Sequence, residues 1–200
     1  MADAAETTLQ FDRVFSDKGE PGALHYNVTY LVGGLEHHME VWRDGQRRLK
    51  RSTDGSIETY VLKSGDSDEF SMSVLDLKKR MSTQIDRNNL YRIGNFTEWF
   101  DLAHGLKHPK AAYLLAAIAT PVAAPKTVAH CDWYALSQDG RTTTICWSNE
   151  ARIPLAMLSG DGRSSWLVTQ VERVHAPAGT FEIHDSGFIH NDANQDIDRD

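Results

Sequence analysis

The chain has 200 residues, a formal net charge of −7, 40% hydrophobic residues and 24% charged residues. This composition is typical of one soluble globular domain. It argues against a disordered chain, a collagen-like chain and a broadly basic nucleic-acid binder. No stretch approaches the roughly 18 consecutive apolar residues that a membrane-spanning helix needs.

The first twenty residues are predicted to form a partly flexible N-terminal segment. Residues 1–6 contain neither a basic region nor an apolar run, so they do not form a signal peptide. Small and acidic residues of this kind often follow a removed export signal, and Met1 would then be a start residue added to a mature form. The alternative is a cytoplasmic protein with a frayed terminus.

Short alternating segments separated by turn residues fill the next part of the chain. Strands are predicted at residues 24–32, 35–43, 46–52, 56–63, 70–77 and 80–86. Gly33-Gly34 and Asp44-Gly45 separate the first of these strands and are typical of hairpin turns. Consecutive hairpins indicate an antiparallel meander rather than a parallel sheet.

Basic side chains gather on the second and third predicted strands, at Arg43, Arg47, Arg48, Lys50 and Arg51. Strand alternation sends Arg48 and Lys50 to one face and Arg47 and Arg51 to the other. The arginines either form a patch for a phosphate, a lipid headgroup or an acidic partner, or belong to a solvated sheet face. Aromatic residues are not interleaved with this run in an RNA-binding pattern, so no nucleic-acid partner is expected.

The spacing changes to a helical one between residues 88 and 107, where Asn95 or Thr97 could cap a helix that ends at Gly105. Aromatic residues are concentrated here, and they either pack in the core or form a mobile lid over an apolar ligand cavity. The predicted ligand-binding residues are Tyr26, Tyr30 and Trp42 from the strands and Tyr91, Phe96, Trp99 and Phe100 from this segment.

Residues 111–119 are alanine-rich and form either a short buried helix or a buried strand, with the alanines favouring the helix. Further strands are predicted at residues 127–136, 141–148, 152–158, 164–174 and 180–184. The predicted fold is therefore mainly β, within the α+β class. It is a long curved antiparallel sheet, or half-barrel, of about ten or eleven strands with helices on its concave side.

The two cysteines lie on neighbouring predicted strands. If Leu136 pairs with Arg141, Cys131 directly faces Cys146. Facing residues of this kind are within reach of a disulfide. The disulfide would indicate an oxidising compartment such as a bacterial periplasm. Two reduced, buried thiols are the alternative.

The last sixteen residues contain five aspartates and one arginine and are predicted to form an acidic tail, residues 185–200. Alternating oxygen ligands make the tail a weak cation candidate, through Asp192, Asn194, Asp196, Asp198 and Asp200. A calcium loop needs Gly at its sixth position, where this chain has Ile197. We therefore expect no built metal site, and no motif points to a cofactor.

The order of these segments resembles the LolA/LolB-like fold of bacterial envelope proteins, a group that includes RseB-type sensor domains. The residues that carry the resemblance are Tyr26-x-Val28-x-Tyr30, Met39 to Gly45, Arg47 to Arg51, Ser56 to Val61 and Ser73 to Lys78. The resemblance implies one half-barrel domain over residues 21–184, with a helical insert at about 88–120. It also implies an apolar concave face that accepts lipoprotein acyl chains or another hydrophobic ligand.

Three functions follow as hypotheses. The first is a periplasmic binding or carrier protein for a hydrophobic ligand, such as a lipid. The second is a small enzyme without a cofactor that uses the same cavity, with Glu98, Asp101 or His104 near Tyr91 as candidate catalytic groups. The third is a non-catalytic interaction or sensor module of the bacterial envelope with a protein partner.

Overall fold

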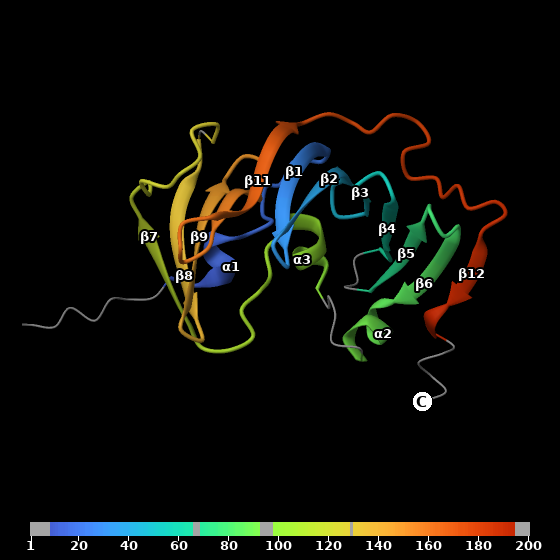
Figure 1. Ribbon diagram of the computed structural model, residues 1–200, viewed down its shortest axis with the longest axis horizontal. Coiled ribbons are helices and arrows are strands. Elements are labelled where there is room, and N and C mark those ends of the chain that lie inside the picture. The colour runs from blue at the N-terminus through green and yellow to red at the C-terminus, as the bar shows by residue number, and fades with distance from the viewer. Residues whose placement is uncertain (1–8, 66–68, 93–97, 129, 195–200) are drawn as a thin grey trace, which may run out of the picture.

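A computed structural model describes residues 9–65, 69–92, 98–128 and 130–194 (Figure 1). The strands are β1 (Leu24–Val32), β2 (Leu35–Asp44), β3 (Arg48–Thr53), β4 (Ile57–Lys63), β5 (Phe70–Asp76), β6 (Met81–Asp86), β7 (Tyr113–Ile118), β8 (Asp132–Gln138), β9 (Arg141–Ser148), β10 (Ile153–Leu158), β11 (Ser164–Glu172) and β12 (Ile189–Asp192). The helices are α1 (Phe11–Val14), α2 (Arg87–Arg92) and α3 (Trp99–His104).

All these strands belong to one curved sheet, in the order β12-β6-β5-β4-β3-β2-β1-β11-β10-β9-β8-β7. The sheet arches over the helices and does not close on itself (Figure 1). The predicted mainly β fold class is therefore confirmed. Within the described residues, no helix is long and apolar enough to cross a membrane.

Hairpins connect most neighbouring strands, as the turn residues predict. At the β1–β2 hairpin, Val32 faces Leu35 and both intervening glycines have positive φ, 59° at Gly33 and 83° at Gly34. Two-residue turns with positive φ at both positions match the right-handed twist of the flanking strands, and glycine adopts them without strain. The turn thus fixes which residues of β1 and β2 share a face.

The alanine-rich segment is a strand, so the helix that its composition favours does not form. Strand β7 pairs with β8 from Tyr113 opposite Gln138 to Ile118 opposite Trp133. Ladder hydrogen bonds from β8 and burial of Leu115 outweigh the weak helix preference of alanine. Strand β8 begins at Asp132. The sequence predicts that it begins earlier, at Thr127.

The predicted disulfide between Cys131 and Cys146 is confirmed, with the two Cα atoms 5.4 Å apart. The register differs from the expected one, because Gln138 rather than Leu136 faces Arg141. The turn therefore has only two residues, and Cys146 faces Trp133 while Cys131 lies diagonally across the ladder. The shift is an even number of residues, so the cysteines remain on one face of the sheet.

The C-terminal part departs from the prediction. Residues 180–184 do not form a strand, and the chain instead crosses to the far edge of the sheet, where it forms β12. Strand β12 pairs in parallel with β6, Ile189 opposite Met81, which makes the sheet mixed (Figure 1). The range predicted as an acidic tail therefore contains a strand. An open sheet edge can pair with an extended segment that has no alternating pattern of its own.

The helical stretch of the chain contains α2 and α3. Helix α3 ends at Gly105, as predicted, with a φ of 69° and a hydrogen bond from its N–H to the Asp101 carbonyl. Glu98 occupies the N-cap position of α3. The predicted caps Asn95 and Thr97 lie outside the described residues.

The face of the sheet that carries α1 and α3 is here called the inner face. In the β7–β10 half, α1 places Phe11 and Phe15 against Ile145 and Trp147. Phe11 and Phe15 are almost fully buried, although they lie in the N-terminal segment that the sequence predicts to be partly flexible. In the other half, α3 packs on the large apolar cluster to which β1 to β6 contribute and which continues into β8 to β11.

Candidate functional site

Helix α3 covers the inner face of the sheet beneath β1 and β2 (Figure 1). Trp99, Leu102, Ala103 and Leu106 recur at helical spacing, which gives α3 one apolar side. The first three of these residues lie in the large core cluster and are almost fully buried. A helix of six residues is too short to be stable alone in water. The position of α3 therefore depends on its contacts with the sheet.

Two arginines of the inner face hold the C-terminal end of α3. Arg43 of β2 donates a hydrogen bond of 3.0 Å to the carbonyl of Ala103. Arg51 of β3 donates to the carbonyl of Leu102. Carbonyl groups in the last turn of a helix lack partners within the helix, and positive charge is favourable there. These contacts attach α3 to an otherwise apolar surface through directional bonds.

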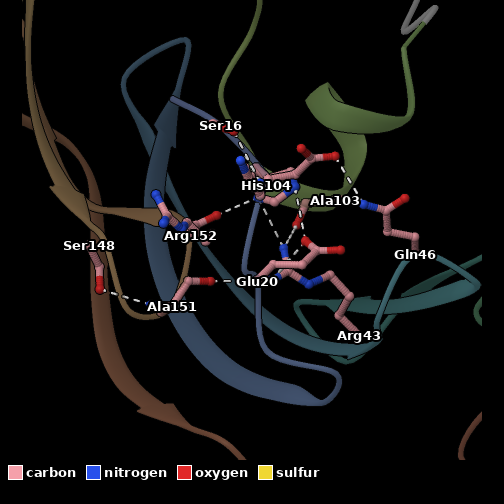
Figure 2. A network of polar contacts seen from close by, with 11 residues as sticks. Ser16, Glu20, Arg43, Gln46, Ala103, His104, Ser148, Ala151 and Arg152 are labelled. Atoms are coloured by element: carbon pink, nitrogen blue, oxygen red, sulfur yellow. Dashed lines mark hydrogen bonds and ion pairs between the residues drawn. The ribbon is translucent and has the colours of Figure 1, made fainter. Parts of the chain in front are cut away.

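Arg43 also joins β2 and α3 to two further segments in a buried polar network (Figure 2). It donates a second hydrogen bond, of 3.2 Å, to the carbonyl of Ala151 in the β9–β10 turn. The carboxylate of Glu20 lies 3.5 Å from Arg43 Nη2 and 3.3 Å from Nε2 of His104. His104 Nδ1 contacts the carbonyl of Arg152. The N-terminal segment, β2, α3 and the β9–β10 turn thus meet at one point.

His104 Nδ1 lies against the Arg152 carbonyl, which can only accept, and 3.1 Å from Nη1 of Arg43, which can only donate. Its Nε2 faces Glu20. Burial, followed by the charge of Arg43, lowers the pKa of His104 to about 3. Burial also raises the pKa of Glu20 above its ordinary value. The network therefore favours the uncharged forms of both groups.

Part of this network is poorly satisfied. Nε of Arg43 is buried without a hydrogen-bond partner, and Glu20 lies at the long end of hydrogen-bond distance from both His104 and Arg43, at 3.3 and 3.5 Å. A buried polar atom without a partner loses its hydration without compensation. The network consequently holds α3 less firmly than its number of contacts suggests, because part of their stabilisation offsets this cost.

The structure divides the predicted ligand-binding residues between two faces. Tyr26 is fully buried on the inner face, and Tyr30 packs against the same cluster. Trp42 lies on the outer face, because it faces His25 across the ladder and stacks on that ring at 3.8 Å. Phe96 and the side chain of Tyr91 lie outside the described residues.

Trp99 and Phe100 are adjacent on α3 and therefore leave it in different directions. Trp99 enters the large core cluster under the helix. Phe100 stacks on His104, with ring centres 4.3 Å apart, and lines an open-sided cavity of about 670 Å³ between α1 and α3. The other lining residues are Asp12, Phe15, Ser16, Asp17, Glu98, Asp101, His108, Pro109 and Lys110. The inner face beneath α3 is filled by the helix.

The three candidate catalytic groups do not converge. Glu98 and Asp101 line the cavity at α1, whereas His104 belongs to the buried network. Burial raises the pKa of Asp101, whose carboxylate accepts a hydrogen bond from the His108 backbone. The cavity thus has one buried carboxyl group, but His104 is separated from it by the Phe100 ring stacked on the imidazole.

The four arginines of the predicted basic patch lie in two places. Arg43 and Arg51 are inside the fold and hold α3. Arg47 and Arg48 are exposed, and both form ion pairs with Asp44. Two inward-facing and two outward-facing arginines therefore replace a single surface patch.

In the weak cation candidate, Asp192 lies in β12 and Asn194 accepts hydrogen bonds from the Asp86 backbone and the Asn89 side chain. Asp196, Asp198 and Asp200 lie outside the described residues. No cluster of three acidic, histidine or cysteine side chains suited to a metal occurs within the described ranges.

Sequence reasoning missed Glu20 and the inward position of Arg43. Glu20 lies in a segment without periodicity, so no local signal marks it. Arg43 follows Met39 and Val41 at every second position, and all three are buried on one face. Alternation alone would have placed this arginine in the core.

No protein-family model and no curated protein matches the chain. Among solved structures, PNGF-II in the P21 space group has a TM-score of 0.50 and 9% identity, over 88% of this chain and 33% of that chain. MucB has a TM-score of 0.43 and 12% identity, over 86% of this chain and 61% of that chain. MucB in complex with MucA(peri) has a TM-score of 0.43 and 13% identity, over 89% and 59%.

The chain therefore spans about a third of PNGF-II and about three fifths of MucB. At 9% identity the likeness to PNGF-II concerns the fold alone. The two similarities to MucB have TM-scores of 0.43 and support no conclusion about function.

Proposed function

We propose that this protein binds and carries a hydrophobic ligand, such as a lipid or a lipoprotein acyl chain, in the bacterial periplasm. Helix α3 is a plug that occupies the ligand's place in the empty protein, and the ligand displaces it. The observation that carries the proposal is the pair of inward-facing arginines, Arg43 and Arg51, which attach the plug by its terminal carbonyls.

The surface beneath α3 suits an acyl chain. Its side chains come from the inner positions of successive strands and are almost entirely buried while the plug is in place. They include Tyr26, Val28, Met39, Val41, Leu49 and Val61. Uncovering them without a replacement would expose apolar area at about 25 cal/mol per Å². A bound acyl chain would restore that burial, so the open form is favoured only with ligand present.

The attachment of the plug also suits release. Apolar packing alone would not fix the orientation of α3. Hydrogen bonds from Arg43 and Arg51 fix its C-terminal end, and few bonds must break for the helix to leave. The burial of the ionisable groups Glu20 and His104 lowers the net stability of the closed arrangement. The disulfide supports the proposed location, because such bonds persist in oxidising compartments.

Fluorescence titration with a polyunsaturated fatty acid probe tests the proposal. The unmodified protein should bind about one probe molecule. Arg51→Gln, which is too short to keep the bond to Leu102, should bind roughly 10- to 150-fold more tightly. A hydrogen bond to a charged group contributes about 1.5–3 kcal/mol, and this much less energy would be needed to open the plug.

Arg47→Gln is the matched control, because Arg47 is exposed and lies outside the plug contacts. Its affinity should stay within about twofold of the unmodified protein. The proposal is wrong if neither the unmodified protein nor Arg51→Gln binds the probe, or if both arginine variants change affinity equally.

A further inference from the structure

The turn between β1 and β2 carries the most concentrated exposed apolar tip in the part of the chain that the structure describes. Leu31 is 39% exposed, Val32 57% and Leu35 69%. Between them, Gly33 and Gly34 have no neighbouring atoms where a side chain would begin. The tip, residues 31–35, is therefore narrow, convex and entirely apolar.

The inner side of this hairpin forms a track from the tip into the core that is apolar except at His37. At the tip, Val32 faces Leu35, and two residues further in, Tyr30 faces His37. The next inner pair is Val28 and Met39, both buried under the plug. Exposure falls along the track from more than half at the tip to almost none at the core.

One aromatic contact connects this track with the end of the plug. The ring of Tyr30 lies 6.1 Å from that of Trp166, centre to centre. Trp166 in turn covers Gly105, where an added Cβ atom would lie 2.7 Å from the indole. The hairpin is therefore connected with the C-terminal end of α3 through two side chains, Tyr30 and Trp166.

Polar groups follow directly behind the tip. Glu36 faces Leu31 across the ladder, and His37 forms a contact of 2.7 Å with the Asp54 carboxylate. Apolar side chains at the tip with polar groups one step behind match the change from acyl chains to headgroups at a bilayer surface. Three side chains on a convex tip fall far short of the roughly 800 Å² per partner that a stable protein interface buries.

We propose that the β1–β2 hairpin tip docks on a lipid bilayer and that the track behind it is the entry route for the hydrophobic ligand. The entry route rests on the proposed carrier function, whereas docking is a separate property of the tip. Val32 and Leu35 insert among the acyl chains, and Tyr30 lies between the membrane and the covered inner face.

Flotation with vesicles of phosphatidylcholine, and of phosphatidylcholine with phosphatidylglycerol, tests docking of the full chain. The double variant Val32→Asp, Leu35→Asp should lower the partition coefficient at least tenfold. Leu114→Asp is the matched control, because Leu114 is an equally exposed apolar residue on β7, 66% exposed. The control should stay within twofold. All altered side chains are exposed, and circular dichroism should show the fold unchanged.

Soluble fatty acid binding, measured without vesicles, should be the same in the tip variant and the unmodified protein. The two assays separate the two proposals. A failure of docking would appear only in flotation, whereas a failure of the carrier function would appear as an absence of fatty acid binding. Docking is excluded if the unmodified protein does not float with either vesicle or if the tip variant floats equally well. A dimer in light scattering that the tip substitutions dissociate would assign the tip to self-association and overturn the proposal.

Discussion

The two halves of the sheet are built differently. Around β9, both faces are covered, and Ile145 and Cys146 are each fully buried although they point in opposite directions. Phe15 packs edge-on against Trp147 on the inner side, and the disulfide crosses the other side. In the half formed by β1 to β6, the inner face is covered by α3, whose end is fixed by Arg43 and Arg51.

One sheet can therefore combine a permanently covered half with a half whose cover is removable. Apolar packing on both faces and a covalent bond leave the β7–β10 half no low-energy way to open. A short helix attached by its terminal carbonyls can leave as a unit, since few bonds must break. The network at Glu20 and Arg43 lies at the boundary between the two halves.

Removing the disulfide should have the largest effect, because it takes away the covalent support of the β7–β10 half. The bond closes a loop with a sequence separation of 15 residues, and its loss should lower the free energy of unfolding by about 3 kcal/mol on the chain-entropy model. The double variant Cys131→Ser, Cys146→Ser tests this in urea unfolding. Reduction of the unmodified protein should give the same loss. Unchanged unfolding midpoints would show that packing alone supports this half.

A substitution at the end of the plug should act on the other half. Gly105→Ala places a side chain at a φ of 69° and against the Trp166 ring. Left-handed strain and overpacking together should destabilise α3 by about 2 kcal/mol. Hydrogen exchange should accelerate for the amides of α3 and remain unchanged for those of β9. Equal acceleration in both regions would contradict independent halves, and Gly140→Ala, in an open turn, is the control for a positive φ alone.

Mild acid should weaken the boundary network by a smaller amount. Burial lowers the pKa of folded His104 to about 3. Between this pH and its ordinary pKa of about 6.5, the unfolded chain binds a proton at this residue and the folded chain does not. Stability should fall with decreasing pH by about 1.4 kcal/mol per pH unit between roughly pH 6 and 5. Glu20 opposes this, because its raised pKa lets the folded state take up a proton that the unfolded state has lost.

The two variants of this pair separate the effects. His104→Gln should remove the loss of stability on mild acidification, and Glu20→Gln should make that loss steeper. Urea unfolding at pH 7, 6 and 5 measures both slopes, with His190→Gln as an exposed histidine control. Parallel slopes in all variants would show that other groups govern the acid response.

Local patterns sufficed for much of this fold. Alternation and Gly-containing turns placed β1 to β6 and β9 to β11 within a few residues, because each hairpin is specified by neighbours in sequence. The same signals failed for β7 and β12, which take their conformation from the strands beside them. The disulfide was predicted correctly although the register of β8 and β9 was not, since a shift of two residues keeps both cysteines on one face.

For the candidate site, the sequence determined the aromatic and apolar content of α3 and the presence of arginines on β2 and β3. Only the tertiary structure decided that Arg43 and Arg51 point inward to the end of that helix, and that Glu20 and the β9–β10 turn join them. The reason is physical. Apolar periodicity is repeated along a chain and can be recognised there, whereas a buried charge depends on partners far apart in sequence, and only folding brings them within hydrogen-bond distance.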